Sequence, residues 1–414
     1  MEQTIKDRIL QIGKREMPEG YVKSVVGIVP ADWKHYTFGD IYSERKEPGN
    51  ENLPLLMVSI HSGVSDGKVD EDKLTKRTKQ IEDKSQYKKA VTGDLVLNMM
   101  RAWQGAIGTV RTTGMVSPAY IVAEPDDKIY PPFMDYFTRI PRMINQIDRQ
   151  SYGVTDFRKR LYWASFIIVD CILPPIEEQQ KIAAILTTQD KVIELKEKRL
   201  AEKLRQKKYL MQQLLTGRKR LPSYWGEWNF PKAKEIFQNV TDKNHKGDLM
   251  VLSATQDKGI MPRNEVDIDI KYDVSSLANY KKVCQGNFVI SLRSFQGGIE
   301  YSAYTGLVSP AYTVLSSKKE LCDEYYKQYF KSANFINRLN VAVYGIRDGK
   351  HISFEDFGQL RIPYPPINEQ TAIALVLSTA DREISLLRQD IEQEKQKKKA
   401  LMQLLLTGIV RVNV

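Results

Sequence analysis

The clearest hydrophobic pattern lies toward the C-terminal end of the chain, where apolar residues recur at alternating spacings of four and three. The positions of this repeat are Ile373, Leu377, Ala380, Ile384, Leu387, Ile391, Glu394, Lys398, Leu401 and Leu405. This spacing places the side chains on one helix face and is typical of a coiled coil. Two polar residues, Glu394 and Lys398, interrupt the apolar seam.

An earlier stretch of the chain repeats this pattern less regularly. Its matching positions are Ile182, Leu186, Gln189, Ile193, Lys196, Leu200, Lys203, Lys207, Leu210 and Leu214. Residues 174–217 align with 365–408 without a gap, and 21 of the 44 positions are identical. We therefore predict two long helices that pack on each other as a coiled coil; the alternative is that each packs on its own neighbouring domain.

The ends of both predicted helices carry start and stop signals. Each copy opens with Pro-Pro-Ile, at Pro174 and Pro365, and a Glu-Gln pair follows. Proline before a helix start costs no helix hydrogen bond, and acidic residues in the first turn suit the helix dipole. Each copy closes with LLTG, where Gly217 and Gly408 predict left-handed C-terminal caps. Each helix would then have about 40 residues and a length of roughly 60 Å.

The sequence outside these helices is also duplicated, although more loosely. The matching segments are Val29–Trp33 with Leu221–Trp225, Arg101–Gly105 with Arg293–Gly297, Gly114–Tyr120 with Gly306–Tyr312, and Tyr152–Asp156 with Tyr344–Asp348. Short β-like runs (LVLNMM, SPAYIVA, NFVISL, SPAYTVL) alternate with short helical stretches, and Gly93-Asp94 and Gly286-Asn287 predict turns into strands. The chain therefore repeats one unit twice: a variable domain followed by a long helix.

The predicted fold is α+β, with two tandem mixed α/β domains and two long helices that form an antiparallel coiled coil, arranged with a pseudo-two-fold axis. The predicted segments are 1–28 (N-terminal segment), 29–173 (first variable domain), 174–220 (central long helix), 221–364 (second variable domain) and 365–414 (C-terminal long helix). Residues 1–28 have no clear duplicate. They predict a short helix that caps either the first domain or the coiled coil.

Composition places the chain among globular, cytoplasmic proteins. The chain has 414 residues, which is too long for one ordinary domain. Its residues are 42% hydrophobic and 27% charged, a composition that is sufficient for packed cores. No apolar run approaches the roughly 18 residues of a membrane helix, and the N-terminal 20 residues do not resemble a signal peptide. Three distant cysteines, Cys171, Cys284 and Cys322, show neither disulfide nor zinc spacing, so we expect a reducing cytoplasm and no membrane.

The net charge of +11 is concentrated in the two predicted helices. Residues 191–220 hold eleven Lys/Arg against three Asp/Glu, and residues 382–411 hold seven against four. A basic excess indicates nucleic acid or another polyanion, although a single Lys-rich helix is commonly just a solvated face. The first basic helix could face DNA, or it could bind an acidic partner through Lys196, Lys203 and Lys207; the sequence leaves both open.

Searches for catalytic motifs give negative results. An adenine methyltransferase needs Asn, Asp or Ser before Pro-Pro-aromatic to hold the flipped base, but IYPPF (Ile129–Phe133) has Tyr130 there, and PYPPI (Pro363–Ile367) also fails. FQGG (Phe295–Gly298) is not a convincing cofactor loop, and no P-loop is present. Four scattered histidines show no metal spacing. We therefore expect no catalytic residues, no metal site and no cofactor of its own.

The duplicated Pro-Pro/Glu-Gln helices, the LLTG endings and the GD/GN…QG segment of each domain together resemble the specificity subunit of type I restriction–modification systems. The resemblance covers the chain from about residue 28 onward. It implies that each variable domain is a target recognition domain that reads one half of a split DNA sequence. The helix pair would space these domains and bind the partner subunits.

The resemblance also implies the partners and the chemistry that they supply. These are double-stranded DNA, two adenine-N6 methyltransferase subunits that use S-adenosylmethionine, and, where present, two restriction subunits that use ATP and Mg²⁺. Because the two domains differ in sequence, the two half-sites should differ, and the target should be bipartite and asymmetric. The helix residues proposed for partner binding are Glu178, Gln179, Glu369 and Gln370.

Candidate DNA-binding residues have planar or basic side chains suited to bases or phosphates. They are Arg101, Gln104, Arg158, Arg160, Arg293, Gln296, Arg347, Lys350 and His351. Arg101 and Gln104 recur in the second copy, so a scaffold or phosphate role is favoured for them over base reading. The loops after Tyr152-Gly153 and Tyr344-Gly345 diverge, as do 59–68 and 253–263, and are better candidates for reading different bases. The alternative for them is a solvated basic loop.

Two rival functions remain open. A coiled-coil scaffold whose variable domains bind protein would explain why those domains are nearly neutral in charge. A salt-steep, sequence-dependent affinity for DNA would exclude it. The other rival is an intact but silent copy of a phase-variable locus, which the neighbouring genes would reveal.

Overall fold

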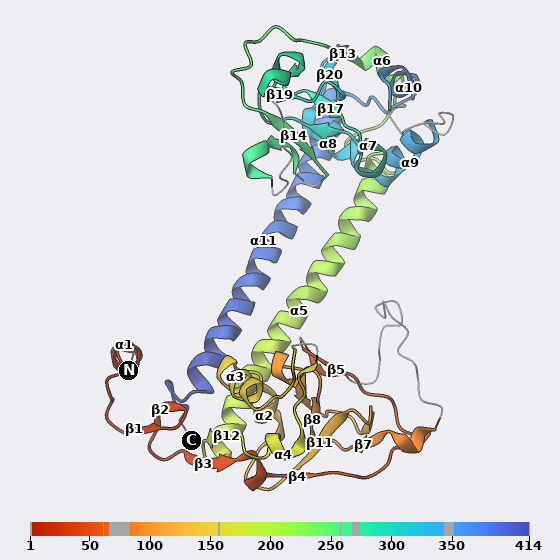
Figure 1. Ribbon diagram of the computed structural model, residues 1–414. Helices are drawn as coiled ribbons and strands as arrows, with labels where there is room; N and C mark the ends of the chain where they lie inside the picture. Colours follow the sequence, from red (N-terminus) through yellow and green to blue (C-terminus); the bar gives the residue numbers. More distant parts are fainter. Residues whose placement is uncertain are drawn as a thin grey trace. The chain divides into compact units, whose positions relative to one another are not determined.

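The computed structural model describes residues 2–60, 62–65, 83–155, 158–256, 258–266, 274–342 and 352–413. The chain divides into two compact units (Figure 1). The first unit comprises Met1–Leu195 and Ile391–Val414, and the second comprises Lys196–Asp390. Each unit therefore contains one variable domain, the start of one long helix and the end of the other.

The two long helices are α5 (Ile176–Leu214) and α11 (Ile367–Leu405), each of 39 residues. Both are followed by a glycine at positive φ, Gly217 at 72° and Gly408 at 73°. Two residues beyond each glycine, a backbone amide bonds back to the helix, from Lys219 to Gln213 and from Val410 to Leu404. The predicted helices and their left-handed caps are thus confirmed, because glycine adopts this conformation without the Cβ clash of other residues.

The helices pack on each other within each unit, which confirms the predicted coiled coil. In the first unit Gln189 Nε2 donates to Glu394 Oε2 at 2.6 Å, and Lys398 pairs with Asp190 at 2.5 Å. In the second unit three lysines of α5 pair with acids of α11: Lys196 with Asp390 (2.8 Å), Lys203 with Glu383 (2.6 Å) and Lys207 with Asp381 (2.5 Å). In the second unit the partner numbers fall along α11 as they rise along α5, so the helices are antiparallel.

The first unit contains a four-stranded antiparallel sheet in the order β4-β11-β8-β9. Its strands are β4 (Tyr42–Glu44), β11 (Tyr120–Pro125), β8 (Leu95–Asn98) and β9 (Ile107–Thr109). Two-stranded pairs flank it: β7 (Lys88–Ala90) with β10 (Gly114–Val116), β5 (Val58–Ser59) with β6 (Gly63–Val64), and β3 (Lys34–Thr37) with β12 (Asp170–Leu173). All four residues of β8 are buried, so this strand lies inside the domain.

The second unit repeats this arrangement with the sheet order β13-β20-β17-β18. Its strands are β13 (Phe237–Val240), β20 (Thr313–Ser317), β17 (Phe288–Ile290) and β18 (Glu300–Tyr301). The pairs β16 (Lys281–Val283) with β19 (Gly306–Val308), and β14 (Leu252–Thr255) with β15 (Gly259–Pro262), match β7–β10 and β5–β6. The duplication seen in sequence is therefore a duplication of topology.

Short helices cover each sheet and attach it to a long helix (Figure 1). They are α2 (Pro131–Phe137), α3 (Pro141–Arg149) and α4 (Trp163–Phe166) in the first unit, and α8 (Asp323–Phe330), α9 (Ala333–Ala342) and α10 (Phe354–Gln359) in the second. The main core of each unit joins sheet and short-helix residues to the long helices, for example Phe133 with Leu186 and Phe330 with Leu377. The predicted mixed α+β domains are thus confirmed.

The N-terminal segment packs on the far end of the chain, within the first unit. It forms α1 (Glu2–Gly13) and a hairpin of β1 (Tyr21–Ser24) and β2 (Gly27–Pro30). The Tyr21 hydroxyl donates to the carbonyl of Gly408 at 2.7 Å, and Arg142 of α3 donates to the carbonyl of Val26 at 3.2 Å. The segment contains the expected short helix, and its hairpin covers the C-terminal end of α11.

Candidate nucleic-acid interface

Each variable domain is held to the long helices by a buried carboxylate at a helix start. In the first unit Glu178 is fully buried; it accepts from Trp33 Nε1 at 3.2 Å and from Arg411 Nε and Nη2, both at 2.7 Å. Arg411 also makes two bonds of 2.8 Å to Asp32. These bonds raise the pKa of Arg411 and lower the pKa of Asp32. An arginine beyond the end of α11 thus joins the start of α5 to the first domain.

We call this set of bonds between a buried glutamate, a tryptophan and an arginine a clamp. The second unit has the same clamp, formed at the start of α11 and after the end of α5. Glu369 is fully buried and accepts from Trp228 Nε1 at 2.9 Å and from Arg220 Nε and Nη2 at 2.5 and 2.7 Å. Arg220 also lies over the Trp228 ring, 5.3 Å from its centroid. Bidentate, charge-assisted bonds of this kind are strong and directional. Arg220 and Arg411 each stand three residues after an LLTG glycine, and this shared signal in the sequence was missed.

The glutamine that follows each of these glutamates also bonds a domain to the start of a long helix. Gln179 accepts from the Tyr130 amide at 2.8 Å and donates to the carbonyl of Pro174 at 2.9 Å; Gln370 bonds Cys322 and Pro365 in the same way. Glu178, Gln179, Glu369 and Gln370 are therefore all buried and bonded within the chain. Their predicted role in partner binding stays a prediction, and their position gives them a different one, which is to orient the domains on the helices.

The clamp also corrects one detail of the repeat alignment. Sequence comparison matched Trp33 with Trp225, but Trp225 is 83% exposed, and it is Trp228 that bonds the buried glutamate. The alignment followed the Pro-x-x-Trp spacing, which both Leu221–Trp225 and Val29–Trp33 share. The buried hydrogen bond, rather than the spacing, identifies the matching residue.

The shared Arg-x-x-Gln-Gly segments form exposed turns at the same place in both units. Arg101 precedes the short 3₁₀ helix η4 (Ala102–Gln104) after β8, and Gly105 follows it at φ 95°. Arg293 precedes α7 (Ser294–Gly297) after β17. The side chains of Arg101, Gln104, Arg293 and Gln296 are all exposed, as groups that contact DNA must be.

A tyrosine links each turn to the neighbouring hairpin. The pKa values of Tyr120 and Tyr312 are raised, because burial outweighs the opposing effect of a bond to the hairpin backbone, at Val58 or Ala254. The positive charge of the nearby arginine, Arg101 or Arg293, also lowers the pKa. Each turn thus lies beside the hairpin that precedes it in the chain.

Arg158 and Arg160 lie in a second exposed feature of the first unit, a loop closed by mutual backbone bonds between Tyr152 and Arg160. A Cβ on Gly153 would lie 2.5 Å from the backbone of Arg158, so only glycine permits this closure. The Leu161 amide donates to the carbonyl of Met99 at 2.9 Å, which ties the loop to the segment between β8 and the Arg101 turn.

Lys159 of this loop lies over the ring of Trp103, 5.2 Å from its centroid. The structure therefore brings together Arg101, Gln104, Arg158 and Arg160 on one part of the first unit. Their predicted counterparts Arg347, Lys350 and His351 lie outside the described residues.

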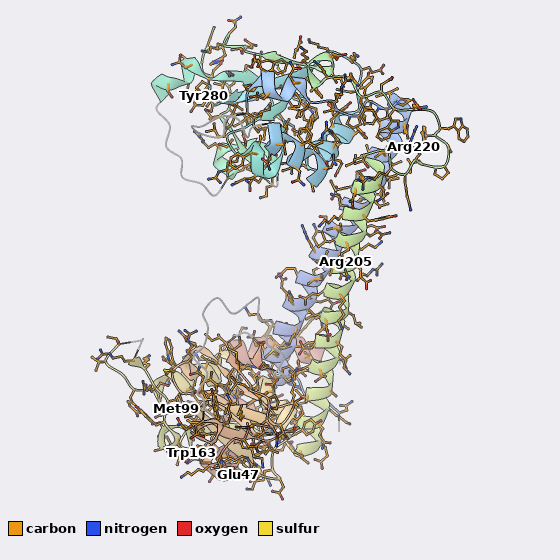
Figure 2. All side chains as sticks on the ribbon, turned by 90° about the vertical axis from the view of Figure 1, so that its right-hand side faces the viewer. Glu47, Met99, Trp163, Arg205, Arg220 and Tyr280 are labelled. Carbon is orange, nitrogen blue, oxygen red and sulfur yellow. The ribbon has the colours of Figure 1, made fainter. Side chains whose placement is uncertain are left out.

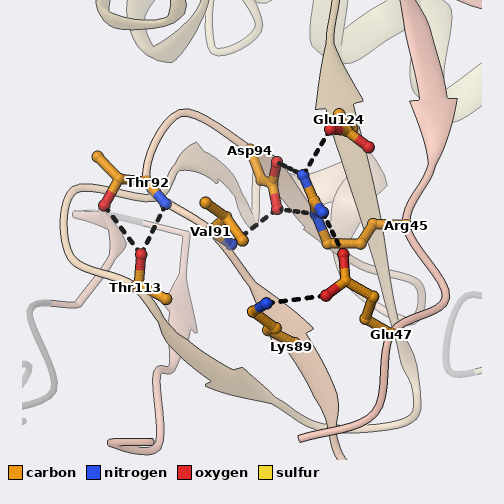
Figure 3. A network of polar contacts seen from close by, with 8 residues as sticks. All are labelled: Arg45, Glu47, Lys89, Val91, Thr92, Asp94, Thr113 and Glu124. Carbon is orange, nitrogen blue, oxygen red and sulfur yellow. Dashed lines mark hydrogen bonds and ion pairs between the residues drawn. The ribbon is translucent and has the colours of Figure 1, made fainter.

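A network of ion pairs surrounds Asp94, in the turn that precedes β8 (Figure 3). The Asp94 carboxylate is 2% exposed, accepts from the amide of Val91 at 2.8 Å, and pairs with Arg45 at 2.7 Å. Burial raises the pKa of Asp94, and the bonds to Asp94 raise the pKa of Arg45. Arg45 also pairs with Glu124 at 2.9 Å and with Glu47, which bonds Lys89. The predicted turn at Gly93-Asp94 is confirmed, with Gly93 at φ 101°.

The matching turn of the second unit has an uncharged residue in place of the buried carboxylate. Asn287 Oδ1 accepts from the Cys284 amide at 2.9 Å, as Asp94 does from Val91. Strand pairing places Val240 opposite Val314, where Arg45 bonds Val122 in the first unit, so Val240 is the counterpart of Arg45. At the positions of Arg45 and Asp94, which touch in the first unit, the second unit therefore has Val240 and Asn287.

Most lysines of the polar seam are already paired within the chain. Lys196, Lys203 and Lys207 bond acids of α11, so their proposed use in partner docking is not supported. Other basic residues of this region, such as Arg205 on α5, are exposed (Figure 2). A groove of about 460 Å³ beside the end of α5 is lined by Lys208 and Arg218, together with Asn334 and Asn337 of α9.

Within the residues that the structure describes, no group of three or more His, Cys, Asp or Glu side chains could hold a metal ion. The same part of the chain contains no helix with the length and apolar content needed to span a bilayer. The sequence prediction of no bound cofactor stays a prediction.

Comparison with known proteins shows the family. The family described as Type I restriction modification DNA specificity domain matches residues 73–205 and 226–396, which are most of the chain. The chain belongs to this family and carries its domain twice. Both copies of the match include part of a variable domain and part of the long helix that follows.

Relatives and solved structures agree with this assignment. The chain is 23% identical to a putative type I restriction enzyme MjaX specificity subunit from Methanocaldococcus jannaschii, over 95% of this chain and 97% of that protein. A crystal structure of the HsdS subunit from Thermoanaerobacter tengcongensis is 18% identical, with a TM-score of 0.52 over 92% of this chain and 98% of that one.

A second solved chain comes from a study of the assembly and conformational transition of the type I R-M system. It is 16% identical, with a TM-score of 0.57 over 92% of this chain and 99% of that one. The predicted resemblance to type I specificity subunits is therefore confirmed, as is the fold. A specificity subunit recognises DNA and is not itself an enzyme, which agrees with the negative motif searches.

Proposed function

We propose that this chain is the cytoplasmic DNA-recognition subunit of a type I restriction–modification complex. It binds a bipartite, asymmetric sequence in double-stranded DNA and directs adenine-N6 methylation and ATP-dependent restriction by its partners. Those partners are two methyltransferase subunits, which carry S-adenosylmethionine, and up to two restriction subunits, which carry ATP and Mg²⁺.

One observation carries this proposal: both units present exposed Arg and Gln side chains on the same turn of the same scaffold, while the loops around the turn differ. Arg and Gln are the side chains that recognise guanine and adenine edges in the major groove. Two readers on one duplicated frame suit a target made of two unlike half-sites. The family membership makes DNA the expected ligand of these surfaces.

A protein-binding scaffold is the rival function, and the near-neutral charge of the variable domains favours it. DNA-binding domains are usually more basic, because phosphate contacts supply most of their non-specific affinity. An adaptor would show neither a preferred DNA sequence nor an affinity that falls steeply with salt.

The deciding experiment is long-read mapping of N6-methyladenine in the native genome, with and without this gene. The proposal expects one bipartite motif to lose methylation when the gene is removed, with adenines on opposite strands in two unlike half-sites. An unchanged methylome, in cells that express the protein and its neighbours, would contradict an active recognition role. DNA binding by the purified complex at several salt concentrations would then separate a silent copy from a scaffold.

A further inference from the structure

One of the differences between the two units is the residue at the tip of the β-hairpin that precedes the shared Arg-x-x-Gln-Gly turn in the chain. In both, a β-hairpin approaches the turn: β5–β6 in the first unit and β14–β15 in the second. The tip glycines Gly63 and Gly259, both at positive φ, pair with Ser59 and Thr255, so the preceding residues Val58 and Ala254 match each other. Two residues further along, the first hairpin carries Ile60 and the second carries Gln256.

Ile60 and Gln256 have different surroundings. Ile60 is partly buried and packs with Tyr120 on the apolar cluster that includes Val96 and Val122. Gln256 is exposed, and its Nε2 donates to Oε1 of Gln296, on the shared turn, at 3.3 Å. The hairpin position that carries an apolar side chain in one domain thus carries an exposed amide in the other.

The position of Gln256 is fixed by the structure around it. Lys331 Nζ donates to the carbonyls of Gln256 and Gly297, at 3.1 and 2.9 Å, and pairs with Glu300 at 2.5 Å. A Cβ on Gly297 would lie 3.1 Å from Cγ of Gln256, so the hairpin lies directly against the turn. One lysine therefore holds the backbone of the hairpin tip to the backbone of the turn, which brings the two exposed amide side chains within bonding distance.

The chemistry of this pair matches one base. The bond between the two amides uses one donor of Gln256 and the acceptor of Gln296, which leaves an acceptor on Gln256 and donors on Gln296. Adenine presents the complementary pair in the major groove, its N6 amino donor and its N7 acceptor. The pair carries no charge, which suits a base edge better than a phosphate.

We propose that the Gln256–Gln296 amide pair reads an adenine in the half-site of the second domain, and that Ile60 is why the same turn in the first domain reads differently. This inference rests on the proposed DNA-recognition function and adds the base and the residues. It also explains how Gln104 and Gln296, although identical, can serve two unlike half-sites.

The test uses the full chain in complex with its methyltransferase subunits, and duplexes built from the motif found by methylation mapping. Gln256→Ile imports the residue of the first domain. We expect discrimination at one adenine position of one half-site to fall about ten- to hundred-fold. The other half-site, read in the same molecule, is the internal control and should keep its specificity, as should the salt dependence of binding.

A second variant keeps the test decisive. Gln296→Glu removes the donors from that side chain, so preference at the same position should shift from adenine toward cytosine, whose amino group needs an acceptor. Equal weakening on all sequences, a change in the other half-site, or unaltered discrimination in both variants would overturn the reading assignment. Wild-type protein with no sequence preference at all would instead overturn the proposed function.

Discussion

The two units of this chain share one topology but differ in the polar residues that stabilise it. In the first, the buried Asp94 pairs with Arg45, which also pairs with Glu47 and Glu124; in the second, the uncharged Asn287 and Val240 stand at the matching positions. In the first, Arg411 joins two carboxylates; in the second, Arg220 binds one carboxylate and lies over an indole ring. The difference teaches that the hydrogen-bond geometry is what the repeats share, while its electrostatics can vary.

The largest expected effect comes from removing a clamp arginine. Arg411→Ala leaves Glu178 buried without its charge partner and should cost about 3–5 kcal/mol of unfolding free energy. Chemical denaturation with proteolytic mapping should show the first domain opening first, because both clamp partners belong to the first unit. Arg220→Ala should instead open the second domain, and Arg205→Ala, an exposed residue of α5, is the matched control. Loss of the same domain in both clamp variants would refute separate clamps.

The next test replaces the charged residues at the Gly93-Asp94 turn with those found at the matching Gly286-Asn287 turn. Arg45→Val alone leaves Asp94 buried and unpaired, which should cost about 2–4 kcal/mol. Adding Asp94→Asn should restore most of this loss, because the second unit already uses Val240 and Asn287. Urea unfolding of both single variants and the double variant measures the coupling. Additive losses would show that the two turns are not equivalent.

The pH dependence of the Arg45→Val variant follows from the sign of the Asp94 shift. Burial raises the pKa of Asp94, so the folded state binds this proton more readily than the unfolded state does. Stability therefore rises as the pH falls through the raised pKa, and urea unfolding of the single variant should show recovery at acid pH. The double variant, in which Asp94→Asn has removed the carboxyl group, should show no such recovery.

A comparison of DNA contacts tests whether the domains act separately. Arg158→Ala or Arg160→Ala should weaken reading of one half-site by about 1–3 kcal/mol if the side chain makes a bidentate base contact. The other half-site should be unaffected, and Arg347→Ala should show the reverse selectivity. Competition binding with duplexes altered in one half at a time measures this. Equal loss on every sequence would assign these arginines to phosphates instead.

The smallest expected effect distinguishes the two helix caps. Gly408→Ala forces a Cβ to 2.5 Å from the Pro30 ring, whereas Gly217→Ala meets its nearest atom, in Trp228, at 3.1 Å. Both also place alanine at positive φ, which costs roughly 1 kcal/mol. We expect Gly408→Ala to be the more destabilising by about 1 kcal/mol, because the proline ring can shift less. Thermal unfolding of both variants checks the order, and an equal change would show that only φ matters.

The sequence was informative wherever a pattern repeats or has a period. The long helices, their glycine caps, the sheet strands and the Gly-Asp and Gly-Asn turns all follow from periodicity or local turn chemistry. The polar residues that interrupt the seam of α5 looked like defects or docking sites, because their partners Asp381, Glu383 and Asp390 lie far away in sequence. The antiparallel arrangement was predicted, but the individual ion pairs become visible only when both helices are placed side by side.

The candidate site was harder to predict for a related reason. Arg101, Gln104, Arg293 and Gln296 were found because they repeat, but repetition cannot show which neighbour modifies each turn. Gln256 was only one residue of a variable stretch until its bond to Gln296 was seen. The Glu-Gln pairs were expected at a partner surface because they are shared, yet burial shows that shared residues also hold a fold together.

The attachment of the N-terminal hairpin to the end of α11 has a consequence for gene architecture. Tyr21 bonds Gly408, and Arg411 bonds Asp32, so hydrogen bonds join the N-terminal and C-terminal segments within the first unit. The matching place in the second unit is an unbroken connection through exposed residues, Trp225 among them. A circular permutant that joins the present ends and opens that connection would keep both arginine clamps. The order of the two variable domains along the chain could therefore be exchanged without breaking either clamp.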